Sequence, residues 1–359
     1  MATNENYPNR FAALDGLRGL AAMVVVFSHT LAPFDHSLGL LMETTAFKPL
    51  YWLYDGRLSV FIFWVLSGFV ISQSADRSRR PLTVLLLARW ARLGIPIAAA
   101  LLFSAALGLA FYRTGFSVPS ILQTYYDPAN FTLQTLLRQI SWGVFAGRER
   151  ISLDPVLWTM HAEIIGSCAI YILYRLISPP LRIYAFPLMT VVLLLLGRPY
   201  YMCFSTGAFF RELWKLRRVH ARWPAGVLLL GLSVTLFISP GHPLLADMIN
   251  WAAASAILYA VLASQKFQAI LSARPCQVLG RISFPLYLVH FPIMATIGAS
   301  VDTALGGGHA AGAITFFVIV GLSLIIAYLG TIAVDEPALR LLHRFRGISR
   351  QDRLRRTDD

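Results

Sequence analysis

Ionisable side chains lie on an N-terminal segment that is otherwise apolar enough to enter a membrane. Asp15 and Arg18 are three positions apart, so on a helix they are neighbours on one face. His29 follows Arg18 by eleven positions, which on an α-helix is about 20° of rotation and about 16 Å of rise. Ionisable groups at such depth are costly, and histidine is a natural general base near neutral pH. We therefore predict that His29 is catalytic; a histidine that only bonds a neighbouring helix is the alternative.

Arg89 and Arg92 form a second candidate site just before a predicted span. Their spacing of three positions puts both guanidinium groups on one helix face. Guanidinium groups suit bidentate contacts with phosphate, so the pair predicts a phosphorylated ligand. The alternative is a pair of positive anchors at the cytosolic boundary, which is how we interpret Arg79 and Arg80.

Other polar side chains fall inside predicted spans. Ser67 precedes a glycine, which indicates either close helix packing or a polar wall of a cavity. Glu163 is a lone carboxylate that needs a partner, either in catalysis or in an ion pair with an arginine. Tyr287 and His290 share a helix face because they are three positions apart. Counted from the ends of their spans, His29, Ser67, Glu163 and His290 all come to the middle or outer-middle of the bilayer, which predicts one shared cavity.

The composition identifies a membrane protein. The 359 residues are 57% hydrophobic and 14% charged, with a mean hydropathy of +0.61, whereas soluble domains are about 25% charged. We predict an all-α polytopic helical bundle of about ten transmembrane helices, each about 20 residues long. They fall near 12–33, 54–74, 94–112, 153–175, 183–197, 199–213, 225–239, 246–264, 278–299 and 312–334. The domain division is a short cytosolic N-terminus (1–11), a membrane domain (12–338) and a basic cytosolic tail (339–359).

The charge pattern predicts the orientation. With the N-terminus in the cytosol, 24 of the 31 Lys and Arg residues fall on the cytosolic side, as the positive-inside rule requires. Both chain ends are then cytosolic, and the net charge of +13 needs no nucleic acid as partner. Membrane lipids are the expected partners of most of these cations. The segment 128–150 is expected on the outer side, partly as an amphipathic or re-entrant helix. The three cysteines lack metal-ligand spacing, and we expect no metal.

Taken together, these segments resemble the acyltransferase-3 family of integral-membrane O-acyltransferases over nearly the whole chain. The resemblance rests on Arg10-x3-Leu14-Asp15-Gly16-Leu17-Arg18-Gly19 with His29, on Phe63-Trp64-Val65-Leu66-Ser67-Gly68-Phe69, on Arg89-x2-Arg92 followed by Pro96, on Leu157-Trp158-x4-Glu163, and on Ile282-Ser283-x3-Tyr287-Leu288-x-His290. The sequence departs from the family where Phe284-Pro285 replaces a frequent Tyr-Ser pair and where His161 precedes Glu163. The hydrolase-like domain that some members append is not expected here.

The resemblance implies transfer of an acyl group, most often acetyl, from cytosolic acyl-coenzyme A to a hydroxyl. The usual acceptor is a carbohydrate of a surface polysaccharide, a lipid-linked glycan or a glycolipid, in the cytoplasmic membrane of a bacterium. Some relatives acylate small natural products instead. His29 would be the base or a transient acyl carrier, with Arg18 in the donor channel and Arg89 and Arg92 on the coenzyme A phosphates. The remaining candidates are Asp15, Glu163 and His290 for catalysis and Ser67 and Tyr287 for donor binding.

Two other classes of protein are alternatives to an acyltransferase. A proton-coupled transporter or flippase would use His, Glu and Arg to move protons, although the sequence shows no internal repeat. A purely structural assembly protein would not need several ionisable groups at one depth. Release of the free coenzyme A thiol when an acceptor is present distinguishes the enzyme from both.

Overall fold

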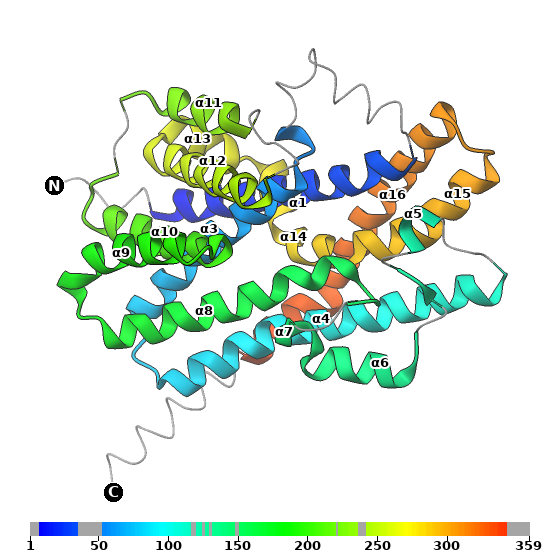
Figure 1. Ribbon diagram of the computed structural model, residues 1–359, viewed down its shortest axis with the longest axis horizontal. Helices are drawn as coiled ribbons and strands as arrows, with labels where there is room; N and C mark the ends of the chain where they lie inside the picture. The colour runs from blue at the N-terminus through cyan, green and yellow to red at the C-terminus, as the bar shows by residue number, and fades with distance from the viewer. Residues whose placement is uncertain are drawn as a thin grey trace, which may run out of the picture.

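The computed structural model describes the chain in separate stretches. They are residues 7–34, 52–115, 120–123, 126–128, 131–147, 151–219, 222–235 and 242–342. All regular structure in these stretches is helical (Figure 1) and they contain no strand, which confirms the predicted all-α fold. The predicted cytosolic tail lies outside the described residues from position 343 onward.

Seven helical segments in the described part of the chain are long and apolar enough to cross a membrane. They are Ala12–Leu31 within α1 (Tyr7–Phe34), Gly56–Arg77 (α3), Leu82–Arg113 (α4), Pro155–Leu176, which contains α8 (Thr159–Leu176), Pro243–Ala263 (α12), Arg274–Ala304, which contains α14 (Arg274–Ile293) and α15 (Ala299–Ala304), and His309–Leu342, which contains α16 (His309–Gly330). Each corresponds to one predicted span.

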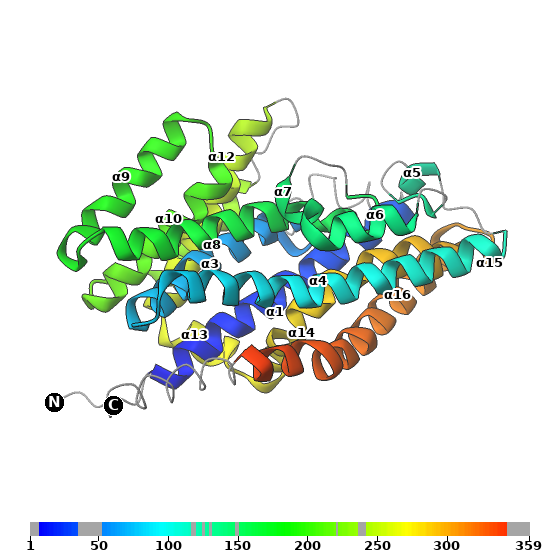
Figure 2. The same cartoon turned by 90° about the horizontal axis from the view of Figure 1, so that it is seen from below.

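The other three predicted spans form shorter helices. These are α9 (Arg182–Leu195), α10 (Pro199–Lys215) and α11 (Pro224–Val234), with 14, 17 and 11 residues. Because a straight helix needs about 20 residues to cross the hydrocarbon core, the total of ten spans stays a prediction. These three helices and α12 gather at one end of the molecule's long axis (Figures 1 and 2).

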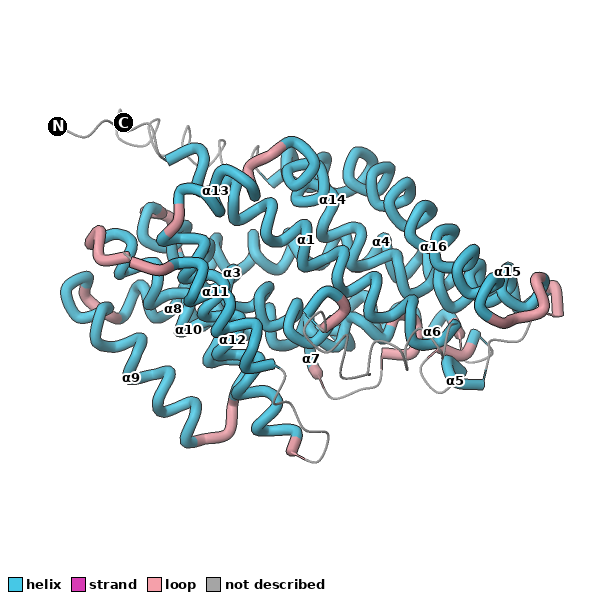
Figure 3. Tube along the Cα trace, turned by 90° about the horizontal axis from the view of Figure 1, so that it is seen from above, coloured by secondary structure: helices cyan, strands magenta, loops and turns pink. Residues whose placement is uncertain are grey.

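Two faces of the bundle can be distinguished. The start of α1 and the short α13 (Gln265–Leu271) lie toward one face, and α5 (Ser120–Gln123) lies with α6 (Leu133–Arg138) and α7 (Val144–Ala146) toward the other (Figures 2 and 3). If the N-terminus is cytosolic, as the charges predict, α13 marks the cytosolic face.

The segment predicted at 128–150 is helical but does not span. A five-residue π-helix joins α6 to α7. Leu133, Leu137 and Trp142 are exposed while Gln139 and Val144 are buried. Residues 129–130 and 148–150 lie outside the described residues.

Glycines let α1 and α14 approach closely. A Cβ added at Gly19 would meet the Gly280 nitrogen at 2.4 Å, and one added at Gly280 would meet the Asp15 carbonyl oxygen at 2.4 Å. Gly68 makes a similar contact between α3 and α10, where an added Cβ would lie 2.3 Å from the Phe204 carbonyl oxygen. Small residues at such crossings are typical of membrane helices, and the packing interpretation of Gly68 is confirmed.

α4 begins earlier than predicted. It starts at Leu82 after the extended Pro81, and it passes Pro96 without a break. The expected start near residue 94 was wrong because the apolar window excluded the two arginines. Arg89 and Arg92 therefore lie within α4, about 10 and 15 Å beyond its first residue.

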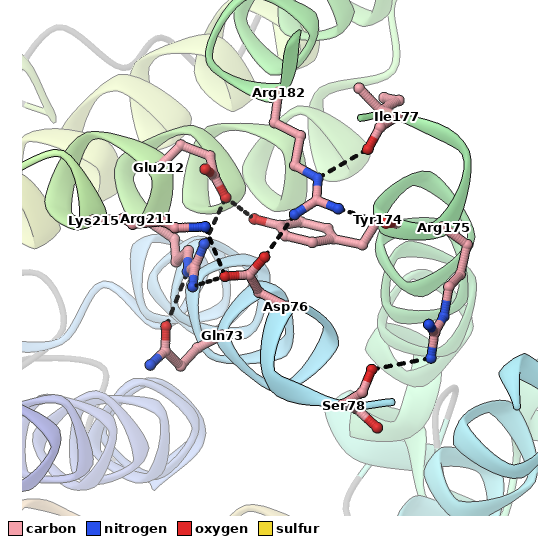
Figure 4. A network of polar contacts seen from close by, with 10 residues as sticks. All are labelled: Gln73, Asp76, Ser78, Tyr174, Arg175, Ile177, Arg182, Arg211, Glu212 and Lys215. Atoms are coloured by element: carbon pink, nitrogen blue, oxygen red, sulfur yellow. Dashed lines mark hydrogen bonds and ion pairs between the residues drawn. The ribbon is translucent and has the colours of Figure 1, made fainter. Parts of the chain in front are cut away.

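An ionic network, buried except at Lys215 and partly at Asp76, joins the predicted cytosolic ends of α3, α8, α9 and α10 (Figure 4). Asp76 accepts hydrogen bonds from Arg182 at 2.6 Å, Arg211 at 2.5 Å and Lys215 at 2.9 Å. Glu212 accepts from Tyr174 at 2.6 Å and from Arg211 at 2.7 Å. From the sequence, Arg182, Arg211 and Lys215 indicate only which side of the membrane is cytosolic. In the structure they also hold the end of α3 in place.

Candidate active site

The predicted site residues converge on one cavity. It has a volume of about 370 Å³ and lies between α1, α3, α4, α8, α14 and the π-helical turn Thr331–Asp335 that follows α16. Seven of the nine predicted residues line it, namely Asp15, Arg18, Ser67, Arg89, Arg92, Glu163 and Tyr287. The sequence predicted one cavity shared by His29, Ser67, Glu163 and His290. This is confirmed for Ser67 and Glu163 and is wrong for the two histidines, which do not line the cavity.

Glu163 lies at the centre of a polar chain on one wall. It accepts a hydrogen bond from Ser67 Oγ at 2.7 Å and forms a close ion pair with Arg89 Nη2. Arg89 Nε also donates to Ser167 Oγ at 3.0 Å. The ion-pair interpretation of Glu163 therefore holds, and its carboxylate fixes the orientation of Arg89.

Arg92 has a partner that the sequence analysis missed. Both of its Nη atoms donate to the two carboxylate oxygens of Asp335, and its guanidinium lies 5.7 Å from the centre of the Phe284 ring. A π-helical turn carries Asp335 at the end of the last span, and such turns are frequent at functional sites. The available sequence signal was the acidic pair Asp335-Glu336 at the predicted cytosolic end of that span.

The mouth of the cavity carries two more exposed ion pairs. Arg18 donates from Nη2 to Asp15 at 2.7 Å and from Nε to Ser283 Oγ at 3.1 Å. Arg281 pairs with Glu336, with 2.8 Å from Nε to Oε1. Because Arg18 bonds to α14, the stripe predicted on α1 faces that helix.

His29 and His290 lie together but do not line the cavity. His290 Nε2 is 3.1 Å from His29 Nδ1, and His290 is fully buried while His29 is half-buried. The cavity ends at Tyr287, one helical turn before His290, where Tyr287 packs edge-on against Phe63. The Tyr287 hydroxyl is 2.9 Å from Thr159 Oγ1. The two histidines therefore lie beyond the inner end of the cavity.

The hydrogen bonds of the two histidines define their neutral tautomers. His290 Nδ1 faces the carbonyl oxygens of Tyr287 at 2.8 Å and Leu286 at 3.2 Å. Since carbonyl oxygens only accept, Nδ1 of His290 carries the hydrogen and its Nε2 is an acceptor. His29 Nδ1 must then donate to His290. The Val25 carbonyl oxygen is a second hydrogen-bond partner of the His29 ring, and because a neutral ring has one N–H it must share the Nδ1 hydrogen. The lone pair on His29 Nε2 is then left to act as a base or nucleophile.

The other candidates do not contact His29. Asp15 and Glu163 pair with arginines, so the groups that bond to the His29 ring are His290 and the Val25 carbonyl oxygen. His161, a third histidine at membrane depth, has Nδ1 2.7 Å from the Phe145 carbonyl oxygen and packs against Gly147. It anchors the α7 segment and takes no part in the cavity. The described residues include no group of three or more His, Cys, Asp or Glu that could hold a metal ion.

The start of α3 supports the turn of α1 that carries His29. A Cβ on Gly56 would meet Ser28 Oγ at 2.7 Å, so the two helices touch there. Asp55 caps α3 by accepting a hydrogen bond from the Leu58 N–H at 2.9 Å. Burial raises the pKa of the Asp55 carboxyl to about 6.

Comparison with known proteins agrees with this geometry. A family model described as an acyltransferase domain matches residues 11–332, which is nearly the whole chain and includes every site residue named above except Asp335 and Glu336. No curated protein and no solved structure matches the chain. The match and the membrane-spanning helices together show that the chain belongs to the acyltransferase-3 family of integral-membrane acyltransferases.

Proposed function

We propose that this protein is an O-acetyltransferase that uses cytosolic acetyl-coenzyme A and acylates a hydroxyl of a carbohydrate. The observation that carries the proposal is the position of His29. An arginine-lined cavity ends one helical turn from the His29–His290 pair, and the free nitrogen of the half-buried His29 can accept a proton. In this proposal the donor reaches the histidine through the cavity and the acceptor from outside it.

The arginines suit the donor. Coenzyme A carries a diphosphate and a 3′-phosphate, and guanidinium groups bind phosphate with charge-assisted hydrogen bonds. Arg18, Arg89 and Arg92 supply such groups around the cavity. With the phosphates there, the pantetheine arm extends toward Tyr287, and the thioester has to pass this side chain to reach His29.

The reaction then needs one base. His29 Nε2 removes the proton of the acceptor hydroxyl as its oxygen attacks the thioester carbonyl carbon, and the C–S bond breaks. The resulting imidazolium returns the proton to the departing thiolate, so the products are an ester and free coenzyme A. In the alternative route His29 Nε2 attacks the thioester carbonyl carbon and the C–S bond breaks, which gives an acyl-imidazole and the coenzyme A thiolate. The acceptor oxygen then takes the acyl group, the bond to His29 Nε2 breaks, and the hydroxyl proton passes to the thiolate. Both routes use the same nitrogen.

The test is acyl transfer by the purified full chain in detergent. Acetyl-coenzyme A is offered with a panel of p-nitrophenyl glycosides, and both free thiol and acetylated glycoside are measured. We expect thiol release that depends on a glycoside and is lost in His29→Ala, while that variant still binds coenzyme A. A protein that moves glycosides across liposome membranes without releasing thiol would instead be a transporter, and the proposal would be wrong.

A small natural product as acceptor remains the second outcome within the enzyme class. Thiol release with hydroxylated small molecules but with no glycoside would identify it.

A further inference from the structure

The end of the bundle that carries His29 also carries a group of aromatic and charged side chains, here called the outer cluster. Its members are Arg57 on α3, Trp158 just before α8, Tyr200 on α10 and Asp247 on α12. The start of α3 also touches the His29 turn of α1, where Gly56 meets Ser28. About 28 Å of helix separates Arg57 from Asp76, which is close to the thickness of a bilayer core, about 30 Å. The outer cluster and the Asp76 network therefore belong to opposite membrane faces.

The aromatic part of the outer cluster packs against the wall of the cavity. Trp64 lines the cavity, and its ring centre lies 4.8 Å from that of Tyr200 and 5.9 Å from that of Trp158. The ring centres of Trp158 and Tyr200 are 5.8 Å apart. Trp64 is buried, whereas Trp158 is 47% exposed, and its indole N–H donates to no described residue. The buried rings hold Trp158 in place and leave its exposed surface available to a ligand.

The polar part of the outer cluster is an ion pair beside these rings. Arg57 donates to one carboxylate oxygen of Asp247, from Nε at 2.8 Å and from Nη2 at 2.6 Å. Tyr200 interacts with the same carboxylate, so the ion pair and the rings are continuous. The Arg57 side chain is half exposed, and its Nη1 donates to no residue that the structure describes. The outer cluster thus combines an aromatic surface with unused hydrogen-bonding capacity.

A sugar ring presents the two matching kinds of surface. Its C–H groups form an apolar face that packs on an aromatic ring, and its hydroxyls donate and accept hydrogen bonds. A tryptophan offers both an apolar body and a polar N–H, and hydrogen bonds to charged groups are stronger than those between neutral groups. A strongly anionic ligand fits less well, because Asp247 already neutralises Arg57.

Tryptophan and tyrosine also occur at membrane interfaces simply as anchors. Trp223 is such a residue. It is 72% exposed just before α11, on the predicted cytosolic side, and it packs against no other aromatic ring in the described part of the chain. Trp158 differs because its neighbours are the cavity wall and, through Tyr200, an ion pair.

We propose that Trp158 and the Arg57–Asp247 pair form the acceptor subsite, which binds a carbohydrate by packing one sugar ring on Trp158 and bonding its hydroxyls to the ion pair. The inference rests on the proposed function, in which the acceptor reaches His29 from outside the donor cavity. A glycan held by the outer cluster lies at the same end of the bundle as His29, on the far side of Trp64 from the donor.

Binding of methyl glycosides to the purified full chain tests the subsite without the donor. Saturation-transfer NMR reports which sugar protons touch the protein, and a titration gives Kd; the detergent must lack a sugar headgroup. We expect Trp158→Leu to raise the Kd by about tenfold and to remove the transfer to the C–H face. Trp158→Phe keeps a ring and should recover part of the affinity. Trp223→Leu is the matched control and should bind as wild type.

The ion pair is tested by a double variant, Arg57→Gln with Asp247→Asn, which keeps the side-chain shapes and leaves no unpaired charge. In the transfer assay this variant and Trp158→Leu should raise the KM for p-nitrophenyl glycosides about tenfold. The KM for acetyl-coenzyme A should stay within twofold of wild type. Thermal stability measured on each variant identifies any that fails to fold.

The outcomes separate this inference from the proposed function. Folded variants whose glycoside Kd and KM equal those of wild type overturn the subsite and leave the enzyme as proposed. Variants in which both KM values rise together show a structural role only and also overturn the subsite. Glycoside binding that depends on Trp158 without any thiol release supports the subsite and contradicts the proposed function. A wild type that neither binds nor acetylates any glycoside overturns both.

Discussion

His290 decides which nitrogen of His29 can react. Its own Nδ1 is occupied by two carbonyl oxygens, so its Nε2 is the acceptor that holds the hydrogen on His29 Nδ1. Without that acceptor only the Val25 carbonyl oxygen would hold the ring of His29. His290 acts through His29 and is therefore a positioning residue for the proposed reaction.

Substitution of His290 tests this role. His290→Leu should lower kcat by about tenfold to a hundredfold, the equivalent of one lost hydrogen bond, and leave the KM for acetyl-coenzyme A unchanged. His290→Gln offers an amide oxygen to His29 and should recover part of the loss. The measurement is the steady-state kcat and KM of both variants, with their thermal stability as a control. Equal activity of both variants would show that His290 only fills space.

Arg89 and Arg92 belong to the donor site in the proposed function. Arg92→Ala should weaken acyl-coenzyme A binding by about tenfold to a hundredfold, because a charge-assisted contact contributes about 1.5–3 kcal/mol. Arg92→Lys should recover only part, since a point charge does not replace the planar fork. The exposed Arg79→Ala is the control and should bind normally.

The role of Arg89 has to be tested with a double substitution, because the loss of Arg89 alone leaves the Glu163 carboxylate buried without a cation. Arg89→Ala alone should destabilise the fold, whereas Arg89→Ala with Glu163→Gln should restore thermal stability but not donor affinity. If the double variant binds donor as well as wild type, the arginine is a structural partner of Glu163 only.

Sequence reasoning found seven of the cavity-lining residues and the Asp15–Arg18 pair, but it did not identify the partners that come from other helices. Arg18, Ser67 and Glu163 were recognisable because a polar group deep in an apolar helix is costly and so has a reason to be there. The partners depend on which helices touch, and those contacts join residues very far apart in the chain. Arg92 and Asp335 are separated by 243 positions, and His29 and His290 by 261. Periodicity along one helix carries no information about such pairs.

At the scale of elements, the end of α3 depends on one carboxylate. Asp76 is shared by three cations, of which Arg211 is buried and Lys215 is half-exposed. Removing a partner from a buried ion pair costs about 3–5 kcal/mol, so Asp76→Ala should lower Tm strongly in detergent. Lys215→Ala removes only an exposed pair and should change Tm little. Similar Tm values for both variants would mean that the network does not fix α3.

The start of α3 should show a pH dependence through Asp55. Its pKa is raised from an unfolded value of 3.8 to about 6, so the fold favours the protonated carboxyl. The stabilisation is complete below pH 4 and is lost as the pH rises through 6, which amounts to about 3 kcal/mol. Asp55→Asn keeps a capping oxygen without a charge. Its Tm relative to wild type should therefore increase between pH 5 and pH 7.5, and a constant difference would contradict the assignment.

At the scale of the whole molecule, the orientation in the membrane is open to a direct test. The charge distribution predicts that both chain ends are cytosolic. A C-terminal fusion to a reporter that is active only in the cytosol should be active, and a fusion to one that is active only outside should not. An extracytoplasmic C-terminus would place the arginine-lined mouth on the wrong side for a cytosolic donor.

The predicted number of spans depends on the short helices α9 to α11. Each of them has fewer residues than a straight membrane-spanning helix needs.

The close glycine contact between α1 and α14 leaves these two helices little room to move past each other. Arg18 and His29 both bond to α14, about 16 Å apart along α1. A rotation or sliding of α1 that brought His29 toward the donor mouth would break both bonds at once and drive Gly19 into the backbone of Gly280. Alternating access by rocking of α1 against α14 is therefore unfavourable. In the proposed reaction the acyl group would then have to reach His29 while α1 and α14 keep their contact.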